Sequence, residues 1–246
     1  MDGGDLFNHL CKLKFCSENL SRHVIVQVAN GIKYLHDRGI VHRDIKLENL
    51  MFERIPIVPS NPVSGQNINE GKFILGVGGG GIGRVKIGDF GLSKLIWEGG
   101  THTFCGTRAY MAPEMVMMDE YTINVDMWAL GCVLYDLLCG RSAFDPYGTD
   151  FEGNVTEGKY TFEGLPFGGI GITDQGCCDS LSQSNTKNAD NAILSAKDVI
   201  KHLLCVNPSV RYFKTSAIRF IYVPAIRRYT VDEFLKHPWC KSIQNL

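Results

Sequence analysis

Residues 42–49, HRDIKLEN, are the stretch of sequence that decides how the chain is interpreted. Transfer of a phosphoryl group needs a carboxylate that orients the attacking hydroxyl, a cation that neutralises the transferred group, and oxygen ligands that hold magnesium. Asp44, Lys46 and Asn49 supply these three groups within one short loop. The stretch therefore indicates chemistry on phosphate groups.

Three further motifs follow this loop in an order that supports the same chemistry. DFG at 89–91 offers Asp89 as a second magnesium ligand, APE at 112–114 ends in Glu114, and DMWALG begins with Asp126. An isolated HRD triplet arises by chance in many chains, and a structural loop that happens to carry these residues is the alternative. The presence of all four motifs in this order favours the catalytic interpretation.

Hydrophobic periodicity predicts a mainly helical chain with few and short strands. Apolar residues at helical spacing predict an amphipathic helix over 20–38 and a helix buried on most sides over 124–139. Thr230, with Glu233 three residues later, predicts a capping box at the start of a helix over 230–236. Shorter elements are expected as helices over 115–118 and 195–204, and as strands over 50–52 and 85–87.

The composition is ordinary for a soluble globular protein and argues against several classes of function. Of 246 residues, 44% are hydrophobic and 21% charged, and the net charge of −1 gives no general attraction to nucleic acid or anionic lipid. The 9 cysteines include no C-x-x-C pair, which favours reduced thiols over disulfides or zinc. The longest apolar stretch, 125–139, is too short to span a bilayer. We expect a cytoplasmic or nuclear protein that begins without a signal peptide.

With these motifs the chain resembles the eukaryotic serine/threonine protein kinases, from the hinge to the end of the C-terminal lobe. It is most similar to the calmodulin-kinase-like group and, within it, to fungal kinases activated by stress MAP kinases. This likeness rests on GVGGGGIGRVKIGDFGLSK at 76–94, FCGTRAYMAPE at 104–114 and VDMWALGCVLYDLLCG at 125–140. The resemblance implies one partial kinase domain over 1–246: the mainly α C-terminal lobe of an α+β fold, with small β-hairpins.

The resemblance assigns a role to each residue that matches a family motif. Asp44 resembles the catalytic base and Lys46 the contact to the γ-phosphate of ATP, while Asn49 and Asp89 resemble the ligands of Mg²⁺. Asp5 resembles the hinge acid that binds ribose hydroxyls or a substrate arginine, and Glu48 is assigned with it to the cofactor-binding residues. The other assignments are Met51 beneath the adenine, Arg43 opposite a phosphorylated Thr103, Thr107 on the substrate shelf with a hydrogen bond to the catalytic loop, Glu114 with Arg228 in a buried ion pair, and Asp126 as the structural clamp of the catalytic loop.

The resemblance also implies ATP and Mg²⁺ as cofactors and proteins as substrates. Lys46 favours Ser or Thr over Tyr as the acceptor. Asp5 and Glu48 are acidic at positions where kinases that prefer basic substrates receive arginines, so basic residues upstream of the target are expected. Solvated carboxylates are the alternative. The implied partner is an upstream MAP kinase in stress signalling, with neither nucleic acid nor membrane.

The chain departs from the family pattern at its start. Met1 falls inside the hinge, so the N-terminal lobe would be missing, together with the loop and the lysine that grip the ATP phosphates. The glycines of 78–83 fit the sequence pattern of that loop, but the chain runs from them directly into the DFG motif. We therefore interpret 76–83 as the flexible far end of an insert. We expect a truncated form with little activity, and a catalytically dead binding or scaffold module is the alternative.

Three stretches without periodicity are interpreted as inserts: 55–83, which has no core of its own, 164–190 and 211–226. The last two have the length and composition of short unspliced introns translated as protein. Genuine surface-loop insertions are the alternative, because long loops cost little stability.

Overall fold

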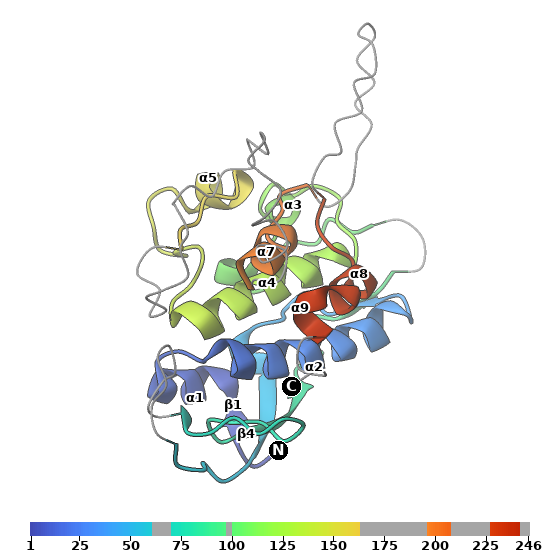
Figure 1. Ribbon diagram of the computed structural model, residues 1–246. Coiled ribbons are helices and arrows are strands. Elements are labelled where there is room, and N and C mark those ends of the chain that lie inside the picture. The colour runs from blue at the N-terminus through green and yellow to red at the C-terminus, as the bar shows by residue number, and fades with distance from the viewer. Residues whose placement is uncertain (61–69, 97–99, 163–195, 208–226, 242–246) are drawn as a thin grey trace, which may run out of the picture.

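The structure, a computed structural model, describes residues 1–60, 70–96, 100–162, 196–207 and 227–241. Among these residues helices dominate and strands are few and short, as predicted. Figure 1 shows α2 (Glu18–His36) and α4 (Asn124–Cys139) lying against each other through the middle of the molecule. α7 (Ala196–Leu203) packs on α4, and α8 (Val231–Lys236) packs on α2. The side chains between these helices form a shared hydrophobic core.

α2 starts and ends two residues earlier than the predicted helix over 20–38. The Ser17 side chain caps its N-terminus by accepting a hydrogen bond from the Leu20 N–H at 3.3 Å. Its buried stripe includes Leu20, Val24, Val28 and Ile32, which the spacing predicted. The capping side chain, more than the apolar stripe, therefore sets the first residue of the helix.

α4 has the predicted bounds, and almost every one of its side chains is buried. Trp128 stacks on Phe144 with ring centroids 5.4 Å apart. Gly140 ends the helix at φ 68°, in the left-handed region that favours glycine, and its N–H donates to Asp136 O at 2.8 Å. Because nearly all its side chains are packed in the core, the helix provides a rigid support for the catalytic loop.

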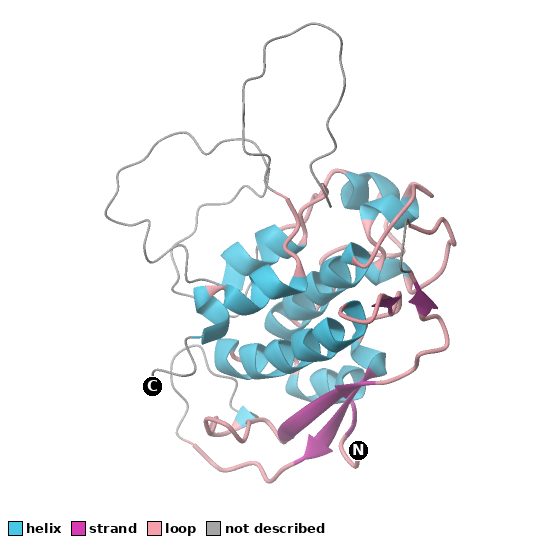
Figure 2. Ribbon diagram, turned by 90° about the vertical axis from the view of Figure 1, so that its right-hand side faces the viewer, coloured by secondary structure: helices cyan, strands magenta, loops and turns pink. Residues whose placement is uncertain are grey.

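Two small antiparallel sheets accompany the helices. The first has the order β1-β3-β4, formed by β1 (Gly4–Asp5), β3 (Leu50–Arg54) and β4 (Ile82–Ile87). In the second, β2 (Ile40–Val41) pairs with β5 (Lys94–Leu95). Figure 2 shows the first sheet at one end of the helices, near the N-terminus. β3 and β4 contain the predicted strands, whereas the two-residue strands were not predicted.

Short elements connect the long helices and carry much of the candidate site. Pro113 occupies the start of α3, which therefore begins two residues before the helix predicted over 115–118. α1 and α5 were not predicted, because elements of 8 and 6 residues show little periodicity. The short elements are α1 (Leu6–Leu13), η1 (Leu47–Asn49), η3 (Arg108–Tyr110), α3 (Pro113–Val116), α5 (Phe151–Thr156) and α9 (Pro238–Lys241).

The insert after β3, which was expected to have no core of its own, is tied to the helical core. The carboxylate of the buried Glu70 accepts hydrogen bonds from the Ser17 N–H, at 2.7 Å, and from the Ser17 hydroxyl, at the N-terminus of α2. Burial raises the pKa of Glu70, and the two donors from Ser17 offset part of that rise. The described part of the insert therefore anchors to a helix end.

The glycine run is held by hydrogen bonds from two helices, and the flexibility expected for 76–83 stays a prediction. His9 Nε2 lies 2.6 Å from Gly80 O, and His23 Nε2 lies 2.9 Å from Gly83 O. Gly78 has φ +128°, and a Cβ there would lie 2.0 Å from Ile82 O. The run therefore uses glycine to pass close to its own backbone, not to cover a phosphate.

The expected inserts over 164–190 and 211–226 lie outside the described residues. The flanks of the second can be described: the Arg228 N–H donates to Asn207 O at 3.0 Å. Residues on either side of 208–226 are thus hydrogen-bonded neighbours. Of the helices in the described ranges, none has the length and hydrophobicity that crossing a bilayer requires.

The capping box at Thr230 is confirmed and leads to a first prediction. The Thr230 hydroxyl accepts from the Glu233 N–H, and the Thr230 N–H donates to Glu233 Oε2 at 2.9 Å. We expect Thr230→Ala to lower the free energy of unfolding by about 1 kcal/mol in urea denaturation at pH 7. An unchanged unfolding free energy would contradict this role.

The same box predicts a dependence of stability on pH. Burial raises the pKa of Glu233, but hydrogen bonds from Arg227 and Thr230 outweigh it and lower the pKa to about 2. Because the pKa is depressed in the folded chain, the contribution of Glu233 is complete above its ordinary pKa of 4.5 and is lost as pH falls toward 2. Glu233→Gln keeps the hydrogen-bonding shape and should remove this part of the acid sensitivity.

Candidate active site

A buried carboxylate of α4 accepts hydrogen bonds from the backbone of the catalytic loop. Asp126, which is fully buried, accepts hydrogen bonds from the N–H groups of His42 and Arg43, both at 2.9 Å. It also lies 2.9 Å from His36 Nε2 at the end of α2. Arg43 adopts φ 70°, a strained conformation for a side chain other than glycine. The clamp at Asp126 offsets this strain and fixes the direction of the residues that follow.

Asp44 lies at the centre of the predicted site residues, and the structure brings three of them into contact with its carboxylate. Lys46 Nζ lies 2.8 Å from Asp44 Oδ2, and the Thr107 hydroxyl donates to Asp44 Oδ1 at 2.7 Å. The Asn49 amide donates to Asp44 Oδ2 at 3.0 Å, and Lys46 also donates to Thr107 Oγ1 at 2.7 Å. These contacts join the catalytic loop to the activation segment.

The surroundings of Asp44 keep its carboxyl ionised. Burial raises the pKa of Asp44, but hydrogen bonds from Lys46, Thr107 and Asn49 outweigh burial, and the pKa lies below its ordinary value. A carboxylate that is ionised at neutral pH can accept a hydrogen bond from a hydroxyl group and orient its oxygen for attack.

Asn49 and Asp89 come together because β3 and β4 are paired. Leu50 pairs with Ile87, and the Gly88 N–H donates to Asn49 O at 2.8 Å, so Asp89 follows directly beside the loop. The Asn49 amide nitrogen donates to Asp44, so the amide oxygen is the atom that would bind a metal ion. Asp89 is exposed and accepts from the Gly91 N–H at 3.1 Å.

This donor set fits magnesium. An amide oxygen and a carboxylate are hard oxygen ligands, and Mg²⁺ takes its remaining ligands from phosphates and water. Among the described residues, no three His, Cys, Asp or Glu side chains gather into a metal site of their own. The pair of Asn49 and Asp89 therefore suits an ion that arrives with a nucleotide.

The residues predicted at the cofactor edge lie on β1, η1 and β3. Asp5 caps α1, and its two carboxylate oxygens accept from the Asn8 N–H at 2.8 Å and the Asn8 amide at 2.9 Å. Met51 is half-buried on β3 and pairs with Asp5 of β1. Glu48 is exposed on η1. Asp5 thus has a structural role that the sequence interpretation missed, and its carboxylate remains at the surface.

Tyr121 links Arg43 of the catalytic loop to Thr103 of the activation segment through hydrogen bonds. Arg43 Nη1 donates to the Tyr121 hydroxyl at 3.3 Å, and that hydroxyl donates to Thr103 O at 2.6 Å. A second cation, Lys94, donates to Thr101 Oγ1 at 2.8 Å, and Thr101 Oγ1 lies 3.2 Å from Thr103 Oγ1. The structure therefore places two cations around the expected phosphorylation site, of which the sequence interpretation named one.

Glu114 and Arg228 form a two-pronged ion pair in the core. Arg228 Nη1 lies 2.6 Å from Glu114 Oε1, and Nη2 lies 3.0 Å from Oε2. Arg228 also donates to Cys205 O and to Asn124 O, both at 3.1 Å. The side chain is fully buried, and the pair joins α3 to the chain just before α8.

The second buried acid of α4, Asp136, was given no role in the sequence analysis. The Tyr110 hydroxyl donates to Asp136 Oδ2 at 2.8 Å, while Asp136 Oδ1 is buried without a hydrogen-bond partner. Burial raises the pKa of Asp136 well above its ordinary value, and the charge of Glu48 adds to the rise. The available signal was an acid that interrupts an otherwise apolar helix.

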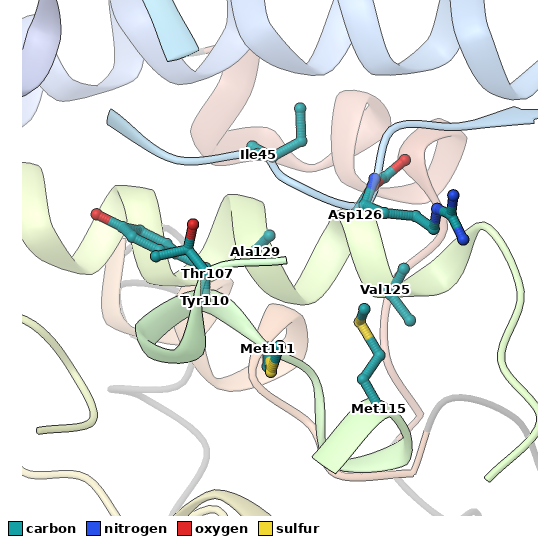
Figure 3. Close-up of a pocket in the computed structure, with 9 residues that line it drawn as sticks. Ile45, Thr107, Tyr110, Met111, Met115, Val125, Asp126 and Ala129 are labelled. Carbon is teal, nitrogen blue, oxygen red and sulfur yellow. The ribbon is translucent and has the colours of Figure 1, made fainter. Parts of the chain in front are cut away.

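A small cavity lies between the catalytic loop and the activation segment. Ile45 lines it from the loop, Thr107 and Tyr110 from the segment, and Val125 and Ala129 from α4 (Figure 3). Its volume of about 10 Å³ is at the lower limit for one water molecule. The cavity is therefore a packing feature next to the loop that carries Asp44 and not a nucleotide site.

Comparisons with known proteins agree with this geometry. The family profile described as "Protein kinase domain" matches residues 1–240. The chain is 43% identical over 246 residues to "Serine/threonine-protein kinase srk1" of Schizosaccharomyces pombe, an alignment that covers 97% of this chain and 36% of srk1.

Two further fungal relatives are similar at comparable levels. "Calcium/calmodulin-dependent protein kinase type II" of Schizosaccharomyces pombe is 40% identical over 98% of this chain and 42% of its own length. "Serine/threonine-protein kinase RCK2" of Saccharomyces cerevisiae is 38% identical over 100% of this chain and 35% of its own length. The chain thus spans less than half the length of these relatives.

Proposed function

Since the chain belongs to the protein kinase domain family, we propose that the protein is a serine/threonine kinase that transfers the γ-phosphate of ATP to protein substrates. The observation that carries the proposal is the ionised Asp44 carboxylate, hydrogen-bonded to Lys46, Thr107 and Asn49 beside Asp89. The relatives named above are called serine/threonine or calcium/calmodulin-dependent protein kinases, which supports the acceptor class.

The chain's own residues would prepare the transfer as follows. Bound Mg²⁺ and ATP would supply the phosphoryl group and screen its charge. Asp44 accepts the hydrogen bond of the substrate hydroxyl and orients it, because its carboxylate is held at both oxygens. Lys46, beside Asp44, would place a positive charge near the transferred group, and Asn49 and Asp89 would hold Mg²⁺ through their side-chain oxygens. Thr107 links this group to the substrate shelf.

We further propose that substrates carry basic residues upstream of the target Ser or Thr. Asp5 and Glu48 are carboxylates at the surface near the site, and the charge of Glu48 acts on Tyr110 of the activation segment. Carboxylates recognise arginine through charge-assisted hydrogen bonds. This region therefore favours cationic over neutral peptides.

Substrate preference provides the test of this proposal. We expect the full-length protein, including any residues that precede or follow this chain, to phosphorylate a peptide with Arg three residues before Ser when ATP and Mg²⁺ are present. Glu48→Gln should lower kcat/KM for this peptide about three- to fivefold, as the loss of an exposed charge pair implies. Glu157→Gln, at an exposed acid paired with Lys159, is the matched control. If the rate is equal for this peptide and for one with Ala in place of the Arg, the proposed preference for basic substrates is contradicted.

The proposal includes regulation through Thr103. A phosphate on Thr103 would attract Arg43 and Lys94, whose present partners are neutral oxygens of Leu92, Tyr121 and Thr101. An upstream MAP kinase, a role in stress signalling, and a cytoplasmic or nuclear location are proposed on the resemblance to fungal stress-activated kinases alone.

A further inference from the structure

We propose that Arg108 selects substrates with an acidic residue directly after the target Ser or Thr. This inference rests on the proposed kinase function and assigns a specificity-determining residue to it. Arg108 follows Thr107, whose hydroxyl lies 2.7 Å from Asp44 Oδ1. A substrate hydroxyl that reaches Asp44 must therefore pass beside the backbone of 107–108, and its neighbouring residue lies within reach of the Arg108 side chain.

The Arg108 guanidinium is held in place but remains open to solvent. It lies over the Phe151 ring, 4.5 Å from the centroid, and Phe151 itself is buried. Its Nη2 lies 3.9 Å from Glu152 Oε1, which is longer than a hydrogen bond, and the Arg108 and Glu152 side chains are 55% and 76% exposed. A substrate carboxylate could therefore form hydrogen bonds with the Arg108 guanidinium in place of Glu152.

An exposed acid, Glu48, lies near the other end of η3. Arg108 and Tyr110 are two residues apart on η3, a helix with three residues per turn, so their side chains leave it in different directions. Arg108 points to α5, whereas Tyr110 points to Asp136 and feels the charge of Glu48. An extended peptide advances about 3.3 Å per residue. If the arginines upstream of the target residue lie toward Glu48, the residue directly after the target faces Arg108.

The test uses three peptides that share an upstream Arg and a target Ser and carry Asp, Asn or Lys after the Ser. For the full-length protein we expect kcat/KM to be about three- to fivefold higher for Asp than for Asn, with Lys the poorest, the range of an exposed charge pair. Arg108→Gln should abolish the difference and Arg108→Glu should reverse it. The preference should also weaken as salt is raised.

The control variant is Arg84→Glu, which reverses another exposed cation, one that pairs with Glu53 on the β3-β4 hairpin. It should leave the order of the three peptides unchanged. Equal rates on all three peptides with wild type, or an order that survives Arg108→Glu, would overturn the inference while leaving the kinase function intact. Failure to phosphorylate any of the peptides would instead contradict the proposed function, and with it the role of Arg108.

Discussion

Replacement of Asp44 by Asn should reduce kcat for phosphoryl transfer by about 100- to 10,000-fold in the full-length protein. Asparagine has the same shape but cannot accept the proton of the attacking hydroxyl, and positioned acid–base groups contribute about 10²- to 10⁴-fold. The fall should appear mainly in kcat and less in KM for ATP, because Asp44 is expected to contact the hydroxyl and not the nucleotide. Radiolabel transfer to peptide measures it directly.

Asp119→Asn, at an exposed aspartate on the loop after α3, is the matched control and should retain activity. A thermal melt should show whether Asp44→Asn keeps its fold. Turnover of Asp44→Asn within tenfold of wild type would contradict the catalytic role. If wild type binds the arginine peptide but transfers no phosphate to it, the binding-module alternative replaces the kinase proposal.

The elements that depend on local chemistry could be predicted from the sequence. The bounds of α4 and the capping box at Thr230 follow from spacing within one helix or one turn, and both have the predicted form. The first residue of α2 could not be placed, because the end of that helix is set by Ser17 and by Glu70, which lies 53 positions away in the chain. Periodicity contains no information about such a contact.

The candidate site shows the same division. The HRDIKLEN loop indicated its chemistry by itself, but the contacts of Asp44 with Thr107 and of Arg43 with Tyr121 join residues 63 and 78 positions apart. The resemblance to a family supplied the first of these contacts and not the second. Lys94 was missed because a lysine on a strand has no distinctive spacing, and the role of Asp136 was missed because an acid in an apolar helix does not by itself show what it contacts. The missing N-terminal lobe stays a prediction.

Replacement of Arg228 by Ala should lower the free energy of unfolding by about 3–5 kcal/mol, the largest stability effect that we expect. The guanidinium is fully buried and engages the Glu114 carboxylate at both oxygens, as well as Cys205 O and Asn124 O. Removal of one partner of a buried ion pair leaves the other charge uncompensated. Urea denaturation measures the loss, which is a large fraction of the 5–15 kcal/mol typical of a folded domain.

The neighbouring residue provides a strict control for this prediction. Arg227 is partly exposed and pairs with Glu233 at the surface, so Arg227→Ala should cost less than about 1 kcal/mol. A double change of Arg228→Met and Glu114→Leu removes both charges and should be less destabilising than Arg228→Ala, because no buried charge remains without a partner. If the two single alanine variants lose equal stability, or the double variant is the least stable of the three, the uncompensated charge is not the cause.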